Sequence, residues 1–107
     1  MKLFNEESEM NLAQAVAFSQ SDPDALLIDV RDADEYAQCH IPGSVNLPLR
    51  FLARDIGDLA PDLETPLLLY CLSGARSSQA ATILTEFGYE NAISVGGITG
   101  YAGELEK

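Results

Sequence analysis

Short apolar runs alternate along this chain with segments in which apolar residues recur at helical spacing. The helical spacing predicts a helix from Ser8 to about residue 18, a short one capped by Asp32, a weak one over 49–56, and a longer one from Arg76 that ends at Gly88. Strand alternating with helix predicts an α/β domain whose mostly parallel sheet carries helices on both faces. The runs that read as buried strands cover residues 25–28, 45–47, 67–70 and 92–95.

The two ends of the chain extend this pattern. Leu3 and Phe4 predict a short first strand, which brings the sheet to about five strands. Gly96 and Gly97 end the final strand, and the tail after them is expected to form one more helical turn. No linker or repeat divides the sequence, so residues 1–107 are expected to form a single domain.

Charge and composition narrow the function. The net charge is −11 and there is no basic patch, which argues against nucleic-acid binding. No apolar run approaches the roughly 20 residues needed to span a bilayer, and acidic residues occupy the N-terminal stretch where a signal peptide needs an apolar core. We therefore expect a cytoplasmic protein without a structural Cys39–Cys71 disulfide. Two cysteines and one histidine cannot form a four-ligand zinc site, and we expect neither a metal nor a cofactor.

Cys71 is the strongest candidate for chemistry because it ends the apolar run just before the longest predicted helix. Amide groups ahead of a helix lack helical partners, and Gly74 allows the loop to turn them inward. Arg76 adds a permanent positive charge. These features favour the thiolate, so the pattern predicts a partly exposed, activated nucleophile above an anion-binding loop. Taken alone, the same spacing fits a structural cysteine at the end of a core strand equally well.

Several ordered stretches together favour the first interpretation. Residues 27–31 (LIDVR), 35–36 (EY), 40–48 (HIPGSVNLP), 71–77 (CLSGARS) and 95–98 (VGGI) resemble the signature segments of the rhodanese domain of single-domain sulfurtransferases. The similarity runs in the family's order from about Leu26 to Tyr101. It implies a rhodanese-like three-layer fold with a central parallel sheet.

The resemblance also implies a mechanism. Cys71 would attack the outer sulfur of a donor such as thiosulfate, form a persulfide, and pass the sulfur to a thiol or to cyanide. The implied partners are that small donor and a thiol acceptor, such as a thioredoxin-like or other sulfur-relay protein, and we expect a monomer. The implied substrate-binding residues are Leu72, Ser73, Gly74, Ala75, Arg76, Ser77 and Arg31.

Four other residues carry expectations. Arg31 could bind an anionic donor, although pairing with Asp29 or Glu35 is the more common role for such an arginine. His40 is the only histidine and lies in a turn motif with a mainly structural part in the family, so we do not expect a Cys–His dyad. Cys39 stands where the family usually has glycine, and a redox role for it is disfavoured. Tyr101 is expected to replace the tryptophan that the family often carries after the double glycine.

Three other functions share this fold. Phosphatases and arsenate reductases related to the dual-specificity cell-cycle phosphatases need a loop one residue longer between cysteine and arginine, and here only Leu72 to Ala75 intervene. Non-catalytic interaction modules typically lack the cysteine that this chain keeps. A carrier that takes sulfur from a protein persulfide remains open, because the acidic chain disfavours fast capture of the thiosulfate dianion.

Overall fold

β3 (Leu67–Cys71) is the central strand, and every one of its side chains is buried. The computed structural model describes Phe4 and residues 10–107, and it pairs β3 with β1 (Leu26–Asp29) and β4 (Ala92–Gly97) in a parallel sheet of order β2-β1-β3-β4. The remaining elements are α1 (Leu12–Ser21), α2 (Ala33–Gln38), β2 (Val45–Asn46), the 3-10 turn η1 (Leu49–Phe51), α3 (Leu52–Leu59) and α4 (Ala75–Glu86).

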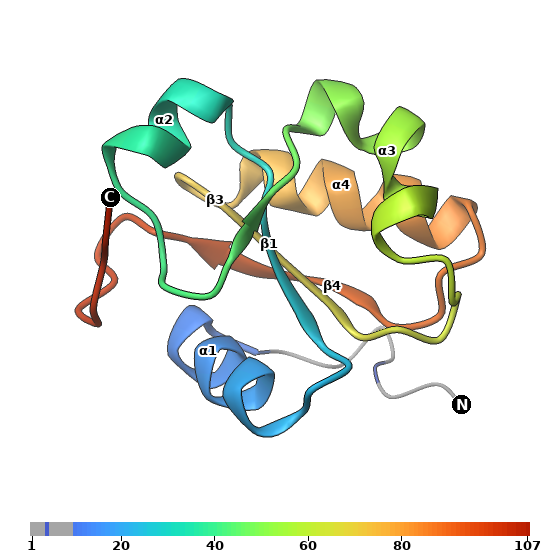
Figure 1. The fold of residues 1–107 in the computed structure, drawn as a ribbon, viewed down its shortest axis with the longest axis horizontal. Helices are drawn as coiled ribbons and strands as arrows, with labels where there is room; N and C mark the ends of the chain where they lie inside the picture. The colour runs from blue at the N-terminus through green and yellow to red at the C-terminus, as the bar shows by residue number, and fades with distance from the viewer. Residues whose placement is uncertain (1–3, 5–9) are drawn as a thin grey trace.

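Helices cover both faces of the sheet. α1 lies on one face, while α3 and α4 lie on the other and α2 lies toward the end of β1 where the chain leaves the sheet (Figure 1). Alternate side chains of β3 enter the two cores. Leu67 and Leu69 pack in the core that contains Ile56 and Leu84, and Leu68 and Tyr70 pack in the core that contains Leu12 and Ala15. The three-layer α/β fold predicted from the sequence is confirmed.

Parallel pairing brings the carboxyl ends of β1 and β3 to one edge of the sheet. Asp29 pairs with Tyr70, and Cys71 follows as the last residue of β3. The ladder between β3 and β4 shifts register between Leu69 and Cys71, where Cys71 comes opposite Gly97. The candidate nucleophile therefore lies where ligands bind in open parallel sheets.

At the N-terminus, part of the predicted structure falls on residues that are not described, and the rest differs from the prediction. Leu3 and Ser8 are outside the described residues, and Phe4 is not in a strand, so the described residues hold four strands. Within the described residues α1 begins at Leu12, with the Asn11 side chain accepting a hydrogen bond from the Gln14 amide at 2.8 Å.

The tail was expected to be helical and this prediction is wrong. After a turn at Ile98 to Tyr101, the chain runs back to form an antiparallel bridge between His40 and Glu106. Glycines at positions 100 and 103 make a helix costly there, and two backbone hydrogen bonds to His40 hold the extended form. Tyr101 packs against the core that contains Leu12 and Ala15, and its replacement of the family's tryptophan stays a prediction.

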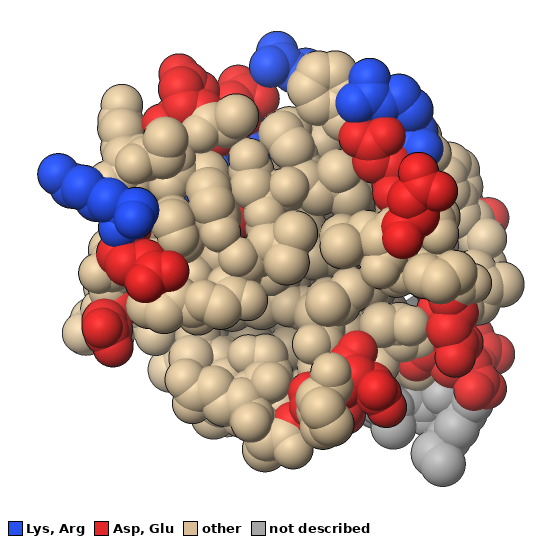
Figure 2. Space-filling model, in the orientation of Figure 1, with Lys and Arg blue, Asp and Glu red and all other residues tan. Residues whose placement is uncertain are grey.

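Acidic side chains outnumber basic ones in the sequence, which has 17 Asp and Glu against 6 Lys and Arg. Figure 2 shows acidic side chains spread around the visible face, with basic ones at only a few places near its rim. Among the described residues, no helix is long and apolar enough to cross a membrane. Nor do histidine, cysteine, aspartate and glutamate side chains gather in a group of three or more that could hold a metal ion in this part of the chain.

Candidate active site

The loop between β3 and α4 wraps around the sulfur of Cys71. Gly74 is the N-cap of α4 and adopts φ +105°, a left-handed conformation that glycine reaches without strain. This conformation turns the loop back on itself, so that the Gly74 N–H donates to Cys71 Sγ at 3.0 Å. The Ser77 N–H, in the first turn of α4, donates to the same sulfur at 3.4 Å.

These contacts set the ionisation of Cys71. Burial acts to raise the pKa of the thiol, but hydrogen bonds from the Ser77 hydroxyl and from loop amides outweigh it, and the pKa lies below its ordinary value. The Ser77 hydroxyl is 3.5 Å from Cys71 Sγ. The loop thus favours the thiolate, which is the nucleophilic form of cysteine.

Cys71 is less exposed than the sequence suggested. The residue is 1% exposed, whereas a partly exposed nucleophile was expected. The cause is its place as the last residue of a fully buried strand, with the loop folded over it. Leu72, Ser73 and Ala75 are exposed and form the outer side of this loop.

Gly97 fixes the position of the loop from the neighbouring strand. A Cβ atom at this position would overlap the backbone of Leu72 and Ser73. The Ile98 N–H donates to the Cys71 carbonyl at 2.9 Å, and the Thr99 N–H donates to that of Leu72 at 3.0 Å. The end of β4 therefore supports the loop by direct backbone contact.

Arg76 is held by a carboxylate. Its Nη1 and Nη2 donate to the two oxygens of Glu35 in α2 at 2.7 and 3.0 Å. The guanidinium holds the pKa of Glu35 well below its ordinary value, at about 2, with a further contribution from the Asp32 N–H. The positive charge that the sequence placed beside Cys71 is thus largely compensated, and the loop amides and the Ser77 hydroxyl are the main stabilisers of the thiolate.

Arg31 lies next to the site but faces inward. It is 3% exposed, and its Nε and Nη2 contact both oxygens of the buried Asp29 at 2.7 to 3.0 Å. Nη2 also donates to the Cys39 carbonyl at 2.7 Å. These are the contacts of the structural role, one of the two roles weighed from the sequence, and donor binding by Arg31 stays a prediction.

His40 and Cys39 serve the turn after α2. The His40 ring stacks on Tyr36 at a centroid distance of 3.7 Å, and its Nδ1 lies 2.8 Å from the Tyr36 carbonyl oxygen. Its Nε2 lies 3.2 Å from Glu106 Oε1. Both ring nitrogens therefore have partners away from Cys71. Cys39 is a half-buried free thiol, and Cys71 is also free.

A groove of about 970 Å³ runs beside the loop, between the start of α1 and β4. None of the described residues that line it is charged, although the chain as a whole is strongly acidic. The polar side chains among them are amides from α1 and its N-cap and hydroxyls from the loop, from α4 and from β4, namely Asn11, Gln14, Ser73, Ser78 and Ser94.

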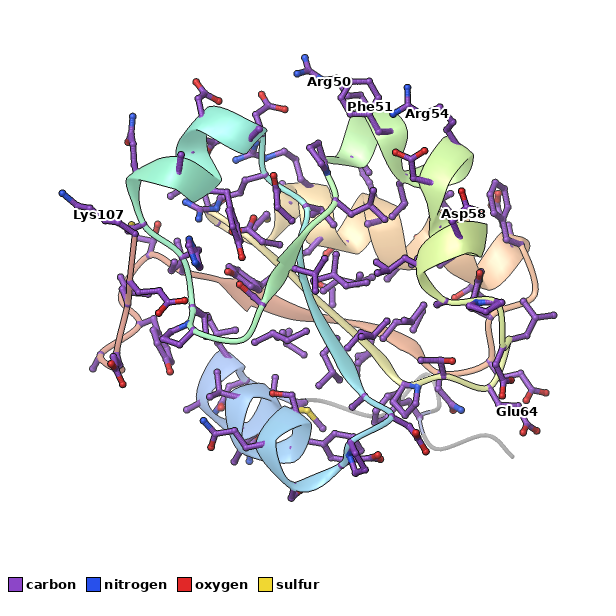
Figure 3. All side chains as sticks on the ribbon, viewed as in Figure 1. Arg50, Phe51, Arg54, Asp58, Glu64 and Lys107 are labelled. Carbon is purple, nitrogen blue, oxygen red and sulfur yellow. The ribbon has the colours of Figure 1, made fainter. Side chains whose placement is uncertain are left out.

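The exposed arginines lie outside this region. Figure 3 shows Arg50 and Arg54 on either side of Phe51 at the outer end of η1 and α3. Their guanidinium carbons are 4.9 and 4.6 Å from the centre of that ring. Arg54 is also paired with Asp55 at 2.8 Å.

Comparison with known proteins shows the family of this chain. A family model described as "Rhodanese-like domain" matches residues 12–104. The chain belongs to the rhodanese-like domain family. This family assignment confirms the resemblance inferred from the sequence.

Two named relatives and a solved structure agree with this assignment. The chain is 38% identical over 71 residues to the thiosulfate sulfurtransferase PspE of Escherichia coli, covering 66% of this chain and 68% of PspE. It is 34% identical over 101 residues to a sulfurtransferase of Allochromatium vinosum, covering 94% of this chain and 90% of the relative. A solved rhodanese with anions from E. coli superimposes with a TM-score of 0.72 at 35% identity, covering 78% of this chain and 98% of that one.

Three residues of this rhodanese-like site were not among the predicted site residues. Glu35 was given as part of a signature segment and as a partner for Arg31, but not as a partner for Arg76, because nothing local links it to a residue 41 positions away. Gly97 was given as a strand end within a signature segment, although a double glycine after a strand can also signal a close backbone approach. Ser94, which reaches the hydroxyl of Ser77, lies in an apolar strand and carried no recognisable signal.

Proposed function

We propose that this protein is a sulfurtransferase that moves a sulfane sulfur from a donor such as thiosulfate to a thiol or cyanide through a persulfide on Cys71. The observation that carries the proposal is the set of donors around one sulfur, with the Gly74 N–H at 3.0 Å and the Ser77 N–H at 3.4 Å from Sγ. Sulfurtransferase names among relatives of similar length support it.

The first half-reaction follows from the thiolate. Cys71 attacks the outer sulfur of thiosulfate, a new sulfur–sulfur bond forms, and sulfite leaves with the electron pair of the bond that breaks. The persulfide keeps one negative charge, now on the terminal sulfur. Amide hydrogens at the start of α4 favour an anion at this place.

The second half-reaction restores the enzyme. An acceptor thiolate attacks the terminal sulfur and leaves as a persulfide, and the electron pair returns to Cys71 as thiolate. No general base is required because the attacking group is already ionised. The acceptor class we propose is a thiol, either small or on a sulfur-relay protein such as a thioredoxin-like one.

Intact mass spectrometry tests the proposal directly. After incubation with thiosulfate, the protein is expected to gain the mass of one sulfur atom and to lose it on addition of cyanide or a thiol. Cys71→Ser is the control that should gain nothing, and Cys39→Ser should still gain the sulfur. Absence of a gain from thiosulfate, mercaptopyruvate and a protein persulfide alike would contradict the proposal and favour an interaction module.

A further inference from the structure

Ser94 brings a second hydroxyl behind the nucleophile. It lies on β4, lines the groove beside the loop, and is half-buried. Its Oγ is 2.7 Å from the Oγ of Ser77, which in turn is 3.5 Å from Cys71 Sγ. Two hydroxyls therefore connect the sulfur with the groove on the other side of the loop.

The single proton of the Ser77 hydroxyl has several competing acceptors. Besides Cys71 Sγ, the carbonyl oxygens of Gly74 and Gly96 lie 3.1 and 3.3 Å from Ser77 Oγ. Ser94 Oγ is the nearest at 2.7 Å, and either hydroxyl can be the donor in this contact. If Ser77 donates its proton to Ser94, the sulfur of Cys71 accepts hydrogen bonds only from backbone N–H groups. If Ser94 donates, the proton of Ser77 is free for the sulfur.

We propose that Ser94 is a positioning residue that donates to Ser77 and thereby directs the Ser77 proton to the thiolate of Cys71. When Cys71 is a neutral thiol, the order reverses: the thiol donates to Ser77, and Ser77 donates to Ser94. The half-buried Ser94 hydroxyl reaches the groove, where it can reorient at little cost. Ionisation of the sulfur and the direction of both hydroxyls are thus coupled.

This role concerns the thiolate itself. Its consequence for sulfur transfer rests on the proposed function, because Cys71 is a thiolate both when it attacks the donor and when it is released by the acceptor. Removing the Ser94 hydroxyl removes the donor that polarises the Ser77 hydroxyl, so Ser77 becomes a weaker hydrogen-bond donor to the sulfur. Loss of part of a hydrogen bond to an anion shifts the thiol toward its neutral form.

The test is the pH dependence of Cys71 alkylation by iodoacetamide, with Cys39→Ser in every protein so that one thiol reacts. For Ser94→Ala we expect the midpoint of the profile to rise. The rate should fall about three- to tenfold at pH values below the midpoint, and it should not fall well above it. Ser94→Thr keeps the hydroxyl and should restore the original midpoint. Ser78→Ala removes a serine hydroxyl from the same groove one residue beyond Ser77 and should change nothing.

Two results would overturn the proposal. One is a Ser94→Ala profile that superimposes on that of the parent protein. The other is a Ser94→Thr profile shifted as far as that of Ser94→Ala, which would indicate a packing effect. Alkylation needs no sulfur donor, so the test is separate from that of the proposed function. A shifted midpoint in a protein that takes no sulfur from any donor would reject the sulfurtransferase and keep the role of Ser94.

Discussion

The Glu35–Arg76 pair offers a sharp test of how the loop is held, because it joins α2 to the first turn of α4. Glu35→Gln keeps the size of the side chain and removes its charge. The pair holds the pKa of Glu35 at about 2, against an ordinary value of about 4.5, and this difference corresponds to an upper limit of about 3 kcal/mol. Both side chains are nearly a third exposed, at 32% and 29%, and solvent screening reduces the expected contribution to about 1 kcal/mol.

The sign of the pH dependence follows from the lowered pKa. The Glu35 carboxylate stabilises the fold when it is ionised in both the folded and the unfolded state. This contribution is lost as the pH falls from about 4.5 toward 2. The difference in free energy of unfolding between the parent and Glu35→Gln should therefore be about 1 kcal/mol at neutral pH, shrink through that interval, and vanish below it. Urea unfolding at a series of pH values measures it.

Asp55→Asn is the matched control for this experiment. Asp55 also accepts two hydrogen bonds from one arginine, Arg54, but these two side chains are 37% and 70% exposed. Its loss should cost less than that of Glu35. The reasoning would be refuted by a Glu35→Gln difference that stays constant across the pH series, or by an equal cost of Asp55→Asn.

Three further predictions follow from backbone and core contacts. Gly97→Ala should lower the free energy of unfolding by about 1–3 kcal/mol and slow Cys71 alkylation, because the added methyl group displaces the loop. The control Gly57→Ala places its methyl group in open space in α3 and should leave the free energy of unfolding unchanged or raise it. Equal effects of the two substitutions on urea unfolding and alkylation would contradict this reasoning. Asn11→Ala should lower the free energy of unfolding by about 0.5–2 kcal/mol, because it removes the N-cap of α1. An unchanged midpoint of urea unfolding would argue against this stabilising role of the cap. Arg31→Met should lower the free energy of unfolding by about 3–5 kcal/mol, because it leaves Asp29 buried without its partner. An unchanged stability with impaired uptake of sulfur from thiosulfate would instead support donor binding by Arg31.

The sequence predicted the site best where one continuous stretch carries it. An apolar run, a cysteine, a small-residue loop and an amphipathic segment follow one another, so β3, the loop and α4 could be placed in order. The conformation of the tail and the first residue of α1 could not be predicted from local sequence. Their conformations depend on single side chains such as Asn11 and on pairing with the distant His40.

Contacts between distant segments account for the rest. Glu35 and Arg76 are far apart in the chain and meet only because α2 and α4 both start at the same edge of the sheet. Ser94 meets Ser77 because β4 pairs with β3, and the register shift at Cys71 brings the end of β4 against the loop. Hydrophobic periodicity predicts which elements form but not which polar side chains they bring together.

Because the side chains of β3 alternate between the two cores, insertions before and after Cys71 have different consequences. Inserting one residue into β3 would exchange the side chains that enter the two cores and would turn Cys71 toward α1 and away from its amide donors. The side chains of the loop after Cys71 enter neither core, since Leu72, Ser73 and Ala75 are exposed. A change of loop length could therefore enlarge the anion site for a different leaving group while the strand beneath it stays the same. New chemistry on this scaffold should arise by insertion after the cysteine and be eliminated by insertion before it.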